Sequence, residues 1–279
     1  MKIDNVLFSC DSSPMYRDFW NPISKHWKIK FGIHPVLLYV GDDLSDLDDS
    51  YGTIIQKSTI PQVPDYMSAT WGRFWATSLF PNQTCLIGDI DMIPLSVDFF
   101  TKQILPYDDD SYIHINGDGY SRGNHHKWKE ENLYSALGAY GHIAKGIVFN
   151  TVYSFEQSFE EEMFKYFNTK FNEVIDGKVV SVKYSEGLDP HLSHANNSSG
   201  GKWGHDEMYS TYKLLQYYKN GGKVETNMSI PPHKRIDRIQ WNYDSLLVKN
   251  GWYIDSHLLR PYSQYKDHID YLMSLVEGF

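Results

Sequence analysis

The strongest constraint on the fold is a repeated alternation in the first part of the chain. Short apolar runs are separated by longer segments that carry apolar and aromatic side chains at helical spacing. The apolar runs, which are typical of strands, lie at residues 5–10, 34–43, 51–56 and 84–96, with helical segments at 11–32 and 65–80. Strands joined by such crossovers run parallel in one sheet. We therefore expect an α/β fold with a central, mostly parallel sheet flanked by helices.

The rest of the chain is less regular. Residues 111–117 and 144–155 are predicted to be strands, 154–171 and 205–220 amphipathic helices, and 251–261 a late strand or loop before a terminal helix. The sequence shows no repeat, low-complexity tract or long linker. We expect its 279 residues to form a single domain.

Composition excludes several classes of partner. The chain has 26 Lys and Arg against 35 Asp and Glu, a formal charge of −9. This balance argues against a nucleic-acid partner, which needs a basic face. Two cysteines, Cys10 and Cys85, are too few for a disulfide scaffold, and no apolar run reaches the length of a transmembrane segment. The polar N-terminus does not read as a signal peptide. We expect a soluble, cytoplasmic protein, and the oligomeric state stays unknown.

Two carboxylates interrupt the apolar run CLIGDIDMIPLS at residues 85–96. In an extended chain residues i and i+2 point the same way, so Asp89 and Asp91 are predicted to converge. Two converging carboxylates need a cation, and oxygen ligands of this kind suit Mg²⁺, Mn²⁺ or Ca²⁺. The alternative is a strand end with two solvated acids. Asp11 and the pair Asp42-Asp43 also follow strands, but we interpret that pair as part of a solvated loop.

The segment LIGDIDMIPL resembles the Asp-x-Asp segment of nucleotide-sugar-dependent glycosyltransferases of the GT-A fold. The order of the elements before it matches as well. The resemblance implies one GT-A (Rossmann-like) domain over residues 1–279, with a nucleotide-binding half at 1–96 and an acceptor-binding half at 97–279. It also implies a divalent metal that bridges the donor diphosphate. Asp89 would approach the ribose or the metal, and Asp91 would ligate the metal.

A second segment, GGKWGHDEMYSTYKL at 200–214, is similar to the Trp-Gly-x-acid-acid segment of many inverting GT-A enzymes. There one carboxylate is the general base that deprotonates the acceptor hydroxyl. The usual Glu-Asp order appears here as Asp206-Glu207, which leaves open which of the two is the base. Acids in a first helical turn also have a simpler interpretation as capping residues. Trp203 and His205 are predicted to contact the substrate.

A third segment, IDSHLLRP at 254–261, places a histidine where GT-A enzymes often supply a further metal ligand. The resemblance gives that role to His257, and imidazole beside carboxylates suits Mn²⁺ better than Mg²⁺. Arg260 and Lys266 follow, and we expect them to neutralise the diphosphate leaving group. The competing interpretation is a structural histidine, since the chain has 12 histidines.

The donor nucleotide is expected over the end of the first strand. Its predicted contacts lie at that strand end or on the helices that precede the Asp-x-Asp segment: Ser9, Cys10, Asp11, Tyr16 and Arg73. Asp11 would accept from the base or ribose, Tyr16 would stack on the base, and Arg73 would reach the donor sugar or phosphate. Two polar, loop-like stretches, 114–132 and 191–203, are expected on the acceptor side.

The resemblance predicts a metal-dependent glycosyltransferase, inverting at the anomeric carbon, that moves a sugar from a nucleotide-sugar donor to a glycan hydroxyl. The default donor is a UDP-sugar carrying galactose, glucose or xylose. The aromatic content of 15% suits the walls of a sugar site. The alternatives are a retaining enzyme, a sugar nucleotidyltransferase and a non-catalytic glycan-binding protein. The compact chain looks like the soluble enzymes of bacteria or of large DNA viruses. If it is viral, we expect it to work in the host cytoplasm.

Overall fold

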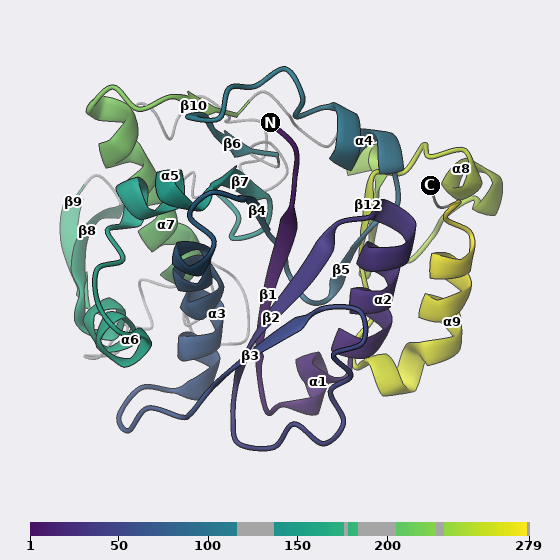
Figure 1. The fold of residues 1–279 in the computed structure, drawn as a ribbon, viewed down its shortest axis with the longest axis horizontal. Coiled ribbons are helices and arrows are strands. Elements are labelled where there is room, and N and C mark those ends of the chain that lie inside the picture. The colour runs from purple at the N-terminus through teal and green to yellow at the C-terminus, as the bar shows by residue number, and fades with distance from the viewer. Residues whose placement is uncertain (116–136, 176–177, 184–204, 227–231, 278–279) are drawn as a thin grey trace.

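The computed structural model describes residues 1–115, 137–175, 178–183, 205–226 and 232–277 (Figure 1). The strands in these ranges are β1 Asn5–Asp11, β2 His34–Val40, β3 Thr53–Lys57, β4 Thr84–Ile87, β5 Met92–Pro94, β6 Tyr112–His114, β7 His142–Lys145, β8 Lys170–Ile175, β9 Lys178–Lys183, β10 Val224–Glu225, β11 Arg235–Asp237 and β12 Asp255–His257. The helices are α1 Pro14–Arg17, α2 Trp20–Phe31, α3 Asp65–Trp75, α4 Val97–Lys102, α5 Gly146–Tyr153, α6 Phe159–Asn168, α7 His205–Lys219, α8 Ser245–Lys249 and α9 Tyr262–Ser274, with 3₁₀ turns η1 Ala76–Leu79 and η5 Pro232–Lys234.

The central sheet has the strand order β10-β6-β7-β4-β1-β2-β3. Strands β4, β1, β2 and β3 are parallel, as are β10 and β6, whereas β7 runs antiparallel to both of its neighbours. Later parts of the sequence contribute as well, because β6, β7 and β10 extend the sheet that the first four strands begin. The predicted α/β fold, with a central, mostly parallel sheet flanked by helices, is confirmed.

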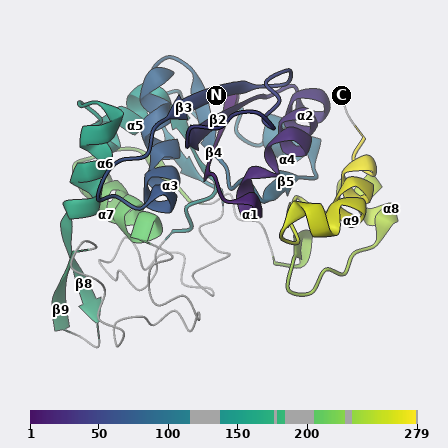
Figure 2. The same cartoon turned by 90° about the horizontal axis from the view of Figure 1, so that it is seen from below.

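Alternate side chains of the central strands face two separate apolar cores. In β1, Val6 and Phe8 belong to the core under α2, α4 and α9, whereas Leu7 belongs to the core under α3, α5, α6 and α7. This period of two is what a strand buried on both faces requires. Figures 1 and 2 show the two groups of helices on opposite sides of the sheet. The carboxyl ends of the parallel strands are thereby held between two packed layers.

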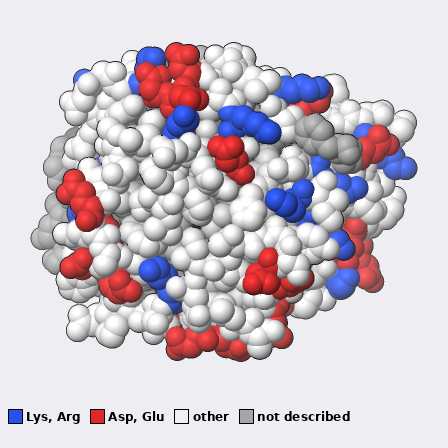
Figure 3. All heavy atoms as spheres, in the orientation of Figure 1, with Lys and Arg blue, Asp and Glu red and all other residues white. Residues whose placement is uncertain are grey.

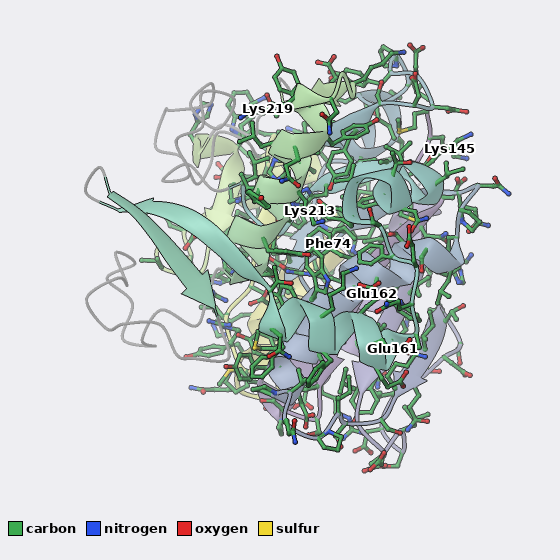
Figure 4. All side chains as sticks on the ribbon, turned by 90° about the vertical axis from the view of Figure 1, so that its left-hand side faces the viewer. Phe74, Lys145, Glu161, Glu162, Lys213 and Lys219 are labelled. Atoms are coloured by element: carbon green, nitrogen blue, oxygen red, sulfur yellow. The ribbon has the colours of Figure 1, made fainter. Side chains whose placement is uncertain are left out.

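Several helix boundaries follow local sequence signals. Helix α2 ends at Gly32, whose φ of 64° is left-handed and suits glycine, as the sequence predicts. Helix α6 begins with a capping box, in which Ser158 and Glu161 satisfy each other's backbone N–H groups. Glu161 and Glu162 lie in its first turn, as Figure 4 shows. The helix is therefore shorter than the predicted range 154–171.

The prediction of a strand over residues 144–155 is wrong for most of its length. Strand β7 ends at Lys145 and the chain turns directly into helix α5. A Cβ atom on Gly146 would lie 2.4 Å from the carbonyl oxygen of Phe80 and 2.5 Å from that of Thr77. The start of α5 therefore packs against the backbone after α3, an approach that only glycine permits.

A smaller sheet joins the end of the chain to the Asp-x-Asp segment. Its order is β11-β12-β5, with β12 parallel to β11 and antiparallel to β5. The late strand predicted within 251–261 is therefore present as β12, and the terminal helix as α9. Strands β8 and β9 form a separate antiparallel pair.

The predictions about cysteines, membrane-spanning segments and surface charge can be compared with the structure directly. Cys10 and Cys85 are both free and buried, which agrees with the absence of a disulfide scaffold. In the described ranges no helix has the length and apolar character needed to cross a membrane. On the face drawn in Figure 3, basic and acidic side chains are interspersed rather than gathered by sign.

Candidate active site

The Asp-x-Asp segment forms a turn rather than an extended strand. Strand β4 ends at Ile87, and the backbone N–H of Met92 donates to the carbonyl oxygen of Asp89 at 2.9 Å. The prediction that the segment is extended, with both carboxylates pointing one way, is therefore wrong. Asp89 pairs with a cation on α3, whereas Asp91 pairs with cations from the end of the chain. The turn thus gives each acid its own surroundings.

Asp89 belongs to the acid-rich cluster, which consists of Arg73, Asp89, Asp206 and Glu207. Arg73 lies in the last turn of α3 and is 6% exposed. One end of its guanidinium donates to the carbonyl oxygen of Gly88 at 2.8 Å and pairs with Asp89, and its Nη2 lies 3.1 Å from Asp206 Oδ2. A single guanidinium therefore ties α3 to the end of β4 and to α7, joining residues that the sequence placed in separate functional segments.

Asp206 and Glu207 occupy the first turn of α7 but have different partners. Asp206 is held by Arg73 and also accepts from the backbone N–H of Glu207 at 3.0 Å. Burial raises the pKa of both carboxyl groups. For Glu207 the charges of Asp206 and Asp89 add to burial and take the pKa to about 8. Glu207 can therefore gain or lose a proton near neutral pH, whereas Asp206 is engaged by Arg73.

Asp91 belongs to the cation-rich cluster, which consists of Asp91, Arg238, His257 and Arg260. Asp91 is 4% exposed. Its Oδ2 atom lies 2.7 Å from Arg238 Nη1, 3.3 Å from His257 Nε2 and 3.6 Å from Arg260 Nη1. The predicted meeting of Asp91 and His257 is present in the structure, and the arginines share the same oxygen.

Backbone pairing explains why His257 reaches Asp91. Strand β12 pairs with β5, and the N–H of Leu258 donates to the carbonyl oxygen of Asp91 at 2.8 Å. On the other side, β11 places Asp237 opposite His257, with 3.9 Å between Asp237 Oδ2 and His257 Nδ1. Two residues earlier in each strand, Arg235 forms a two-pronged ion pair with the fully buried Asp255 at 2.7 and 2.5 Å. The small sheet therefore fixes the imidazole from both sides.

These contacts shift the pKa values of His257 and Asp91. Burial alone would lower the pKa of His257, but the neighbouring carboxylates of Asp237 and Asp91 raise it to about 9. Burial alone would raise the pKa of Asp91, but His257 and the two arginines lower it to about 2. The pair is therefore an imidazolium against a carboxylate at neutral pH.

The side chains near Asp91 can be compared with the ligands that the predicted metal ion prefers. An imidazole nitrogen beside a carboxylate oxygen is a combination that suits Mn²⁺, and Asp91 with His257 would supply it once the His257 ring has lost a proton. In the parts of the chain that the structure describes, no group of three His, Cys, Asp or Glu side chains is already gathered around one point. Asp91 and His257 thus fit such an ion in kind, while Asp89 lies with Arg73 instead.

The residues predicted to contact the nucleotide differ in position. Arg260 donates to the hydroxyl of Tyr16 and lies over its ring, 5.2 Å from the centroid, which links α1 to the cation-rich cluster. Asp11 accepts from the N–H of Ser13 at 3.0 Å and is partly exposed, as is Ser9. Cys10 instead points into the apolar core, where burial raises the pKa of its thiol, so its side chain does not face a ligand.

Other predicted residues lie elsewhere. Lys266, on α9, is exposed and pairs with Asp270 one turn later rather than with Asp91. Trp203 and the stretches 116–132 and 191–203 fall outside the described residues, as does the side chain of His205. The sequence reasoning missed Arg238 and Asp237. The only sequence signal is that Asp237 ends β11 and Arg238 comes directly after it, and a charged pair at a strand end is common.

No protein-family model matches the chain, and no curated protein matches its sequence. Solved structures that are similar include a galactosyltransferase, LgtC, in complex with donor and acceptor sugar analogs, at 11% identity and a TM-score of 0.44, covering 99% of this chain and 97% of that one. The glycosyltransferase GlyE of Streptococcus pneumoniae TIGR4 is similar at 11% identity and a TM-score of 0.42, covering 93% of this chain and 55% of GlyE. The bifunctional WbbM has 10% identity, a TM-score of 0.44, and coverage of 97% and 50%. Likenesses of this degree carry no conclusion about what this chain does.

Proposed function

We propose that the protein is a glycosyltransferase that uses a nucleotide-sugar donor. The observation that carries the proposal is the 3.3 Å contact between Asp91 and His257, which come from distant segments that each resemble part of such a site. The contact lies just beyond the carboxyl end of β4, and Arg260 extends it to Tyr16 after β1. Ligands of parallel sheets bind in this position.

The proposal includes a divalent cation, Mn²⁺ or Mg²⁺, held by Asp91 and His257 with help from Asp89. When bound, such an ion stabilises the negative charge of a departing diphosphate. Arg238 and Arg260 add fixed positive charge at the same place, so a diphosphate is the ligand group that the cation-rich cluster suits best. The base of the nucleotide would lie over the end of β1, near Tyr16.

In the acid-rich cluster we assign the proton transfer to Glu207. Its pKa of about 8 is close to the range in which a group accepts and releases protons efficiently. Asp206 is held in its ion pair with Arg73 and orients the start of α7. Glu207 would take the proton of an acceptor hydroxyl on a glycan while that oxygen bonds to the anomeric carbon of the donor. The nucleoside diphosphate would leave from the opposite side, and this single displacement gives inversion. In a retaining enzyme the same acids would orient the donor.

The first experiment is a thermal-shift or calorimetric screen of UDP-, GDP- and CMP-sugars, each with and without Mn²⁺. We expect a UDP-sugar to stabilise the protein, and Mn²⁺ to increase the effect. The proposal is wrong if no nucleotide sugar binds under either condition.

A second experiment identifies the stereochemical course. NMR of the freshly formed product gives its anomeric configuration, which is compared with that of the donor. Inversion together with loss of activity in Glu207→Gln supports Glu207 as the base. Retention would instead assign the acids to donor orientation.

A further inference from the structure

The cation-rich cluster has an unusual balance of charge for a metal site. A single carboxylate oxygen, Asp91 Oδ2, faces two guanidinium groups and an imidazole. Arg238 is the closest of these, with 2.7 Å between its Nη1 atom and Asp91 Oδ2. Two positive charges held against one carboxylate repel each other, so Arg238 and a metal ion would compete for Asp91.

Accepting the proposed function, we propose that Arg238 is a displaceable counter-ion. It neutralises Asp91 while the site is free of donor, and it releases Asp91 to the metal ion when the donor diphosphate offers it another anion. Metal and nucleotide then bind cooperatively, because each removes the cost of displacing Arg238 for the other.

The local structure suits such a movement. Arg238 follows β11 directly, in a turn where the backbone N–H groups of Gln240 and Trp241 donate to the carbonyl oxygen of Asp237. The next residue, Ile239, is 88% exposed, and the Arg238 side chain keeps 26% of its surface exposed. The turn anchors the backbone, and the long side chain reaches inward from the surface. A change of its torsion angles alone would move the guanidinium.

Arg260 is the weaker candidate for this role. Its guanidinium lies 3.6 Å from Asp91 and also contacts both the ring and the hydroxyl of Tyr16. It is therefore held by groups that a metal ion does not touch. Arg238 makes the shorter contact with Asp91, so its removal changes the surroundings of that carboxylate the most.

The test is isothermal calorimetry of Mn²⁺ binding to the whole protein, alone and with saturating UDP, for the wild type and Arg238→Gln. In the wild type we expect UDP to tighten Mn²⁺ binding. Arg238→Gln is expected to bind Mn²⁺ alone about tenfold more tightly, the effect of removing one competing charge at close range. Its gain from UDP is expected to be smaller than that of the wild type.

The matched control is Lys234→Gln, which removes the same charge from the same segment but contacts Trp252 rather than Asp91. It should bind Mn²⁺ like the wild type. If Arg238→Gln does not fold, as judged by thermal unfolding, Arg238→Lys replaces it, with a smaller increase in Mn²⁺ affinity expected.

The outcomes separate the two proposals. Unchanged or weaker Mn²⁺ binding in the arginine variant, with normal binding in the wild type, overturns the counter-ion proposal and leaves the proposed function standing. Absence of both UDP and Mn²⁺ binding in the wild type overturns the proposed function, and the counter-ion proposal with it.

Discussion

The acid-rich and cation-rich clusters stand on either side of one turn and have opposite imbalances of charge. In the first, a single guanidinium, Arg73, serves Asp89 and Asp206 while Glu207 lies close by. In the second, a single carboxylate, Asp91, serves three cationic groups. Each cluster therefore has one residue on which the rest depend. The excess of acid suits proton transfer, and the excess of cation suits an anionic leaving group.

The largest effect is expected from Arg73→Gln. This change leaves buried carboxylates without their cation, a defect that typically costs about 3–5 kcal/mol of unfolding free energy. Denaturant unfolding followed by circular dichroism measures the loss. The matched change Arg238→Gln should cost less, because the buried Asp91 keeps His257 and Arg260 as partners. Equal losses in the two variants would contradict the difference between the clusters.

The next effect concerns Asp91→Asn, which leaves the three cationic groups without their carboxylate. We expect the proposed transfer activity to fall by about 100-fold to 1,000-fold, the usual range when one electrostatic partner of a reacting group is lost. Release of nucleotide from the donor measures it. Asp98→Asn, at an exposed i,i+4 pair on α4, is the control and should stay fully active. An active Asp91→Asn enzyme would show that the cation-rich cluster is structural.

A pH-dependent effect is expected under the cation-rich cluster. Buried His26 donates to the carbonyl oxygen of Pro94 in β5 at 3.0 Å, and burial lowers its pKa from 6.5 to about 4. The unfolded state therefore binds the proton more readily. Stability falls as pH drops below about 6.5, and the loss is complete below about 4, reaching about 3 kcal/mol.

The measurement is unfolding free energy against pH, in the wild type and in His26→Gln. The variant lacks this titration, so the difference between the two proteins should change through the window between the two pKa values. His268→Gln is the control, because that side chain is exposed on α9. A constant difference for His26→Gln would contradict the prediction.

The smallest effect is expected from Thr211→Val beside the acid-rich cluster. Thr211 Oγ1 accepts from the N–H of Leu137 at 2.8 Å and donates to the carbonyl oxygen of Glu207. Its loss should cost about 1 kcal/mol of stability and also lower activity. Ser158→Ala removes a helix cap at a similar cost but lies on α6, so it should leave activity unchanged. Equal activity in both variants would show that the proposed role of Glu207 does not depend on its hydrogen bond with Thr211.

The sequence predicted the features that depend on local pattern. Buried apolar runs such as β1 and β2 can be recognised as strands from the sequence, and Gly32 marks the end of α2. The strand prediction over α5 failed because a short apolar run fits a strand or a helix equally. The choice depends on the packing of Gly146 against a backbone far away in the chain.

The site was predictable in its residue types but not in its partners. Asp91 and His257 were expected to meet, and they do. The divergence of Asp89 from Asp91 depends on the turn that ends β4, which a two-residue spacing does not reveal. Arg238 lies 147 positions from Asp91 and has no motif of its own. Such a partner is visible only after β11, β12 and β5 have been placed together.

The small sheet β11-β12-β5 also bears on the order of synthesis and folding. Strand β5 is synthesised well before β12, the strand with which it pairs. Contacts between such distant segments form late, because closing a long loop is entropically costly. A nascent chain that already has β1 to β4 therefore lacks the imidazole and both arginines of the cation-rich cluster. The growing polypeptide would carry a folded platform at the ribosome before β12 docks and completes the cation-rich cluster.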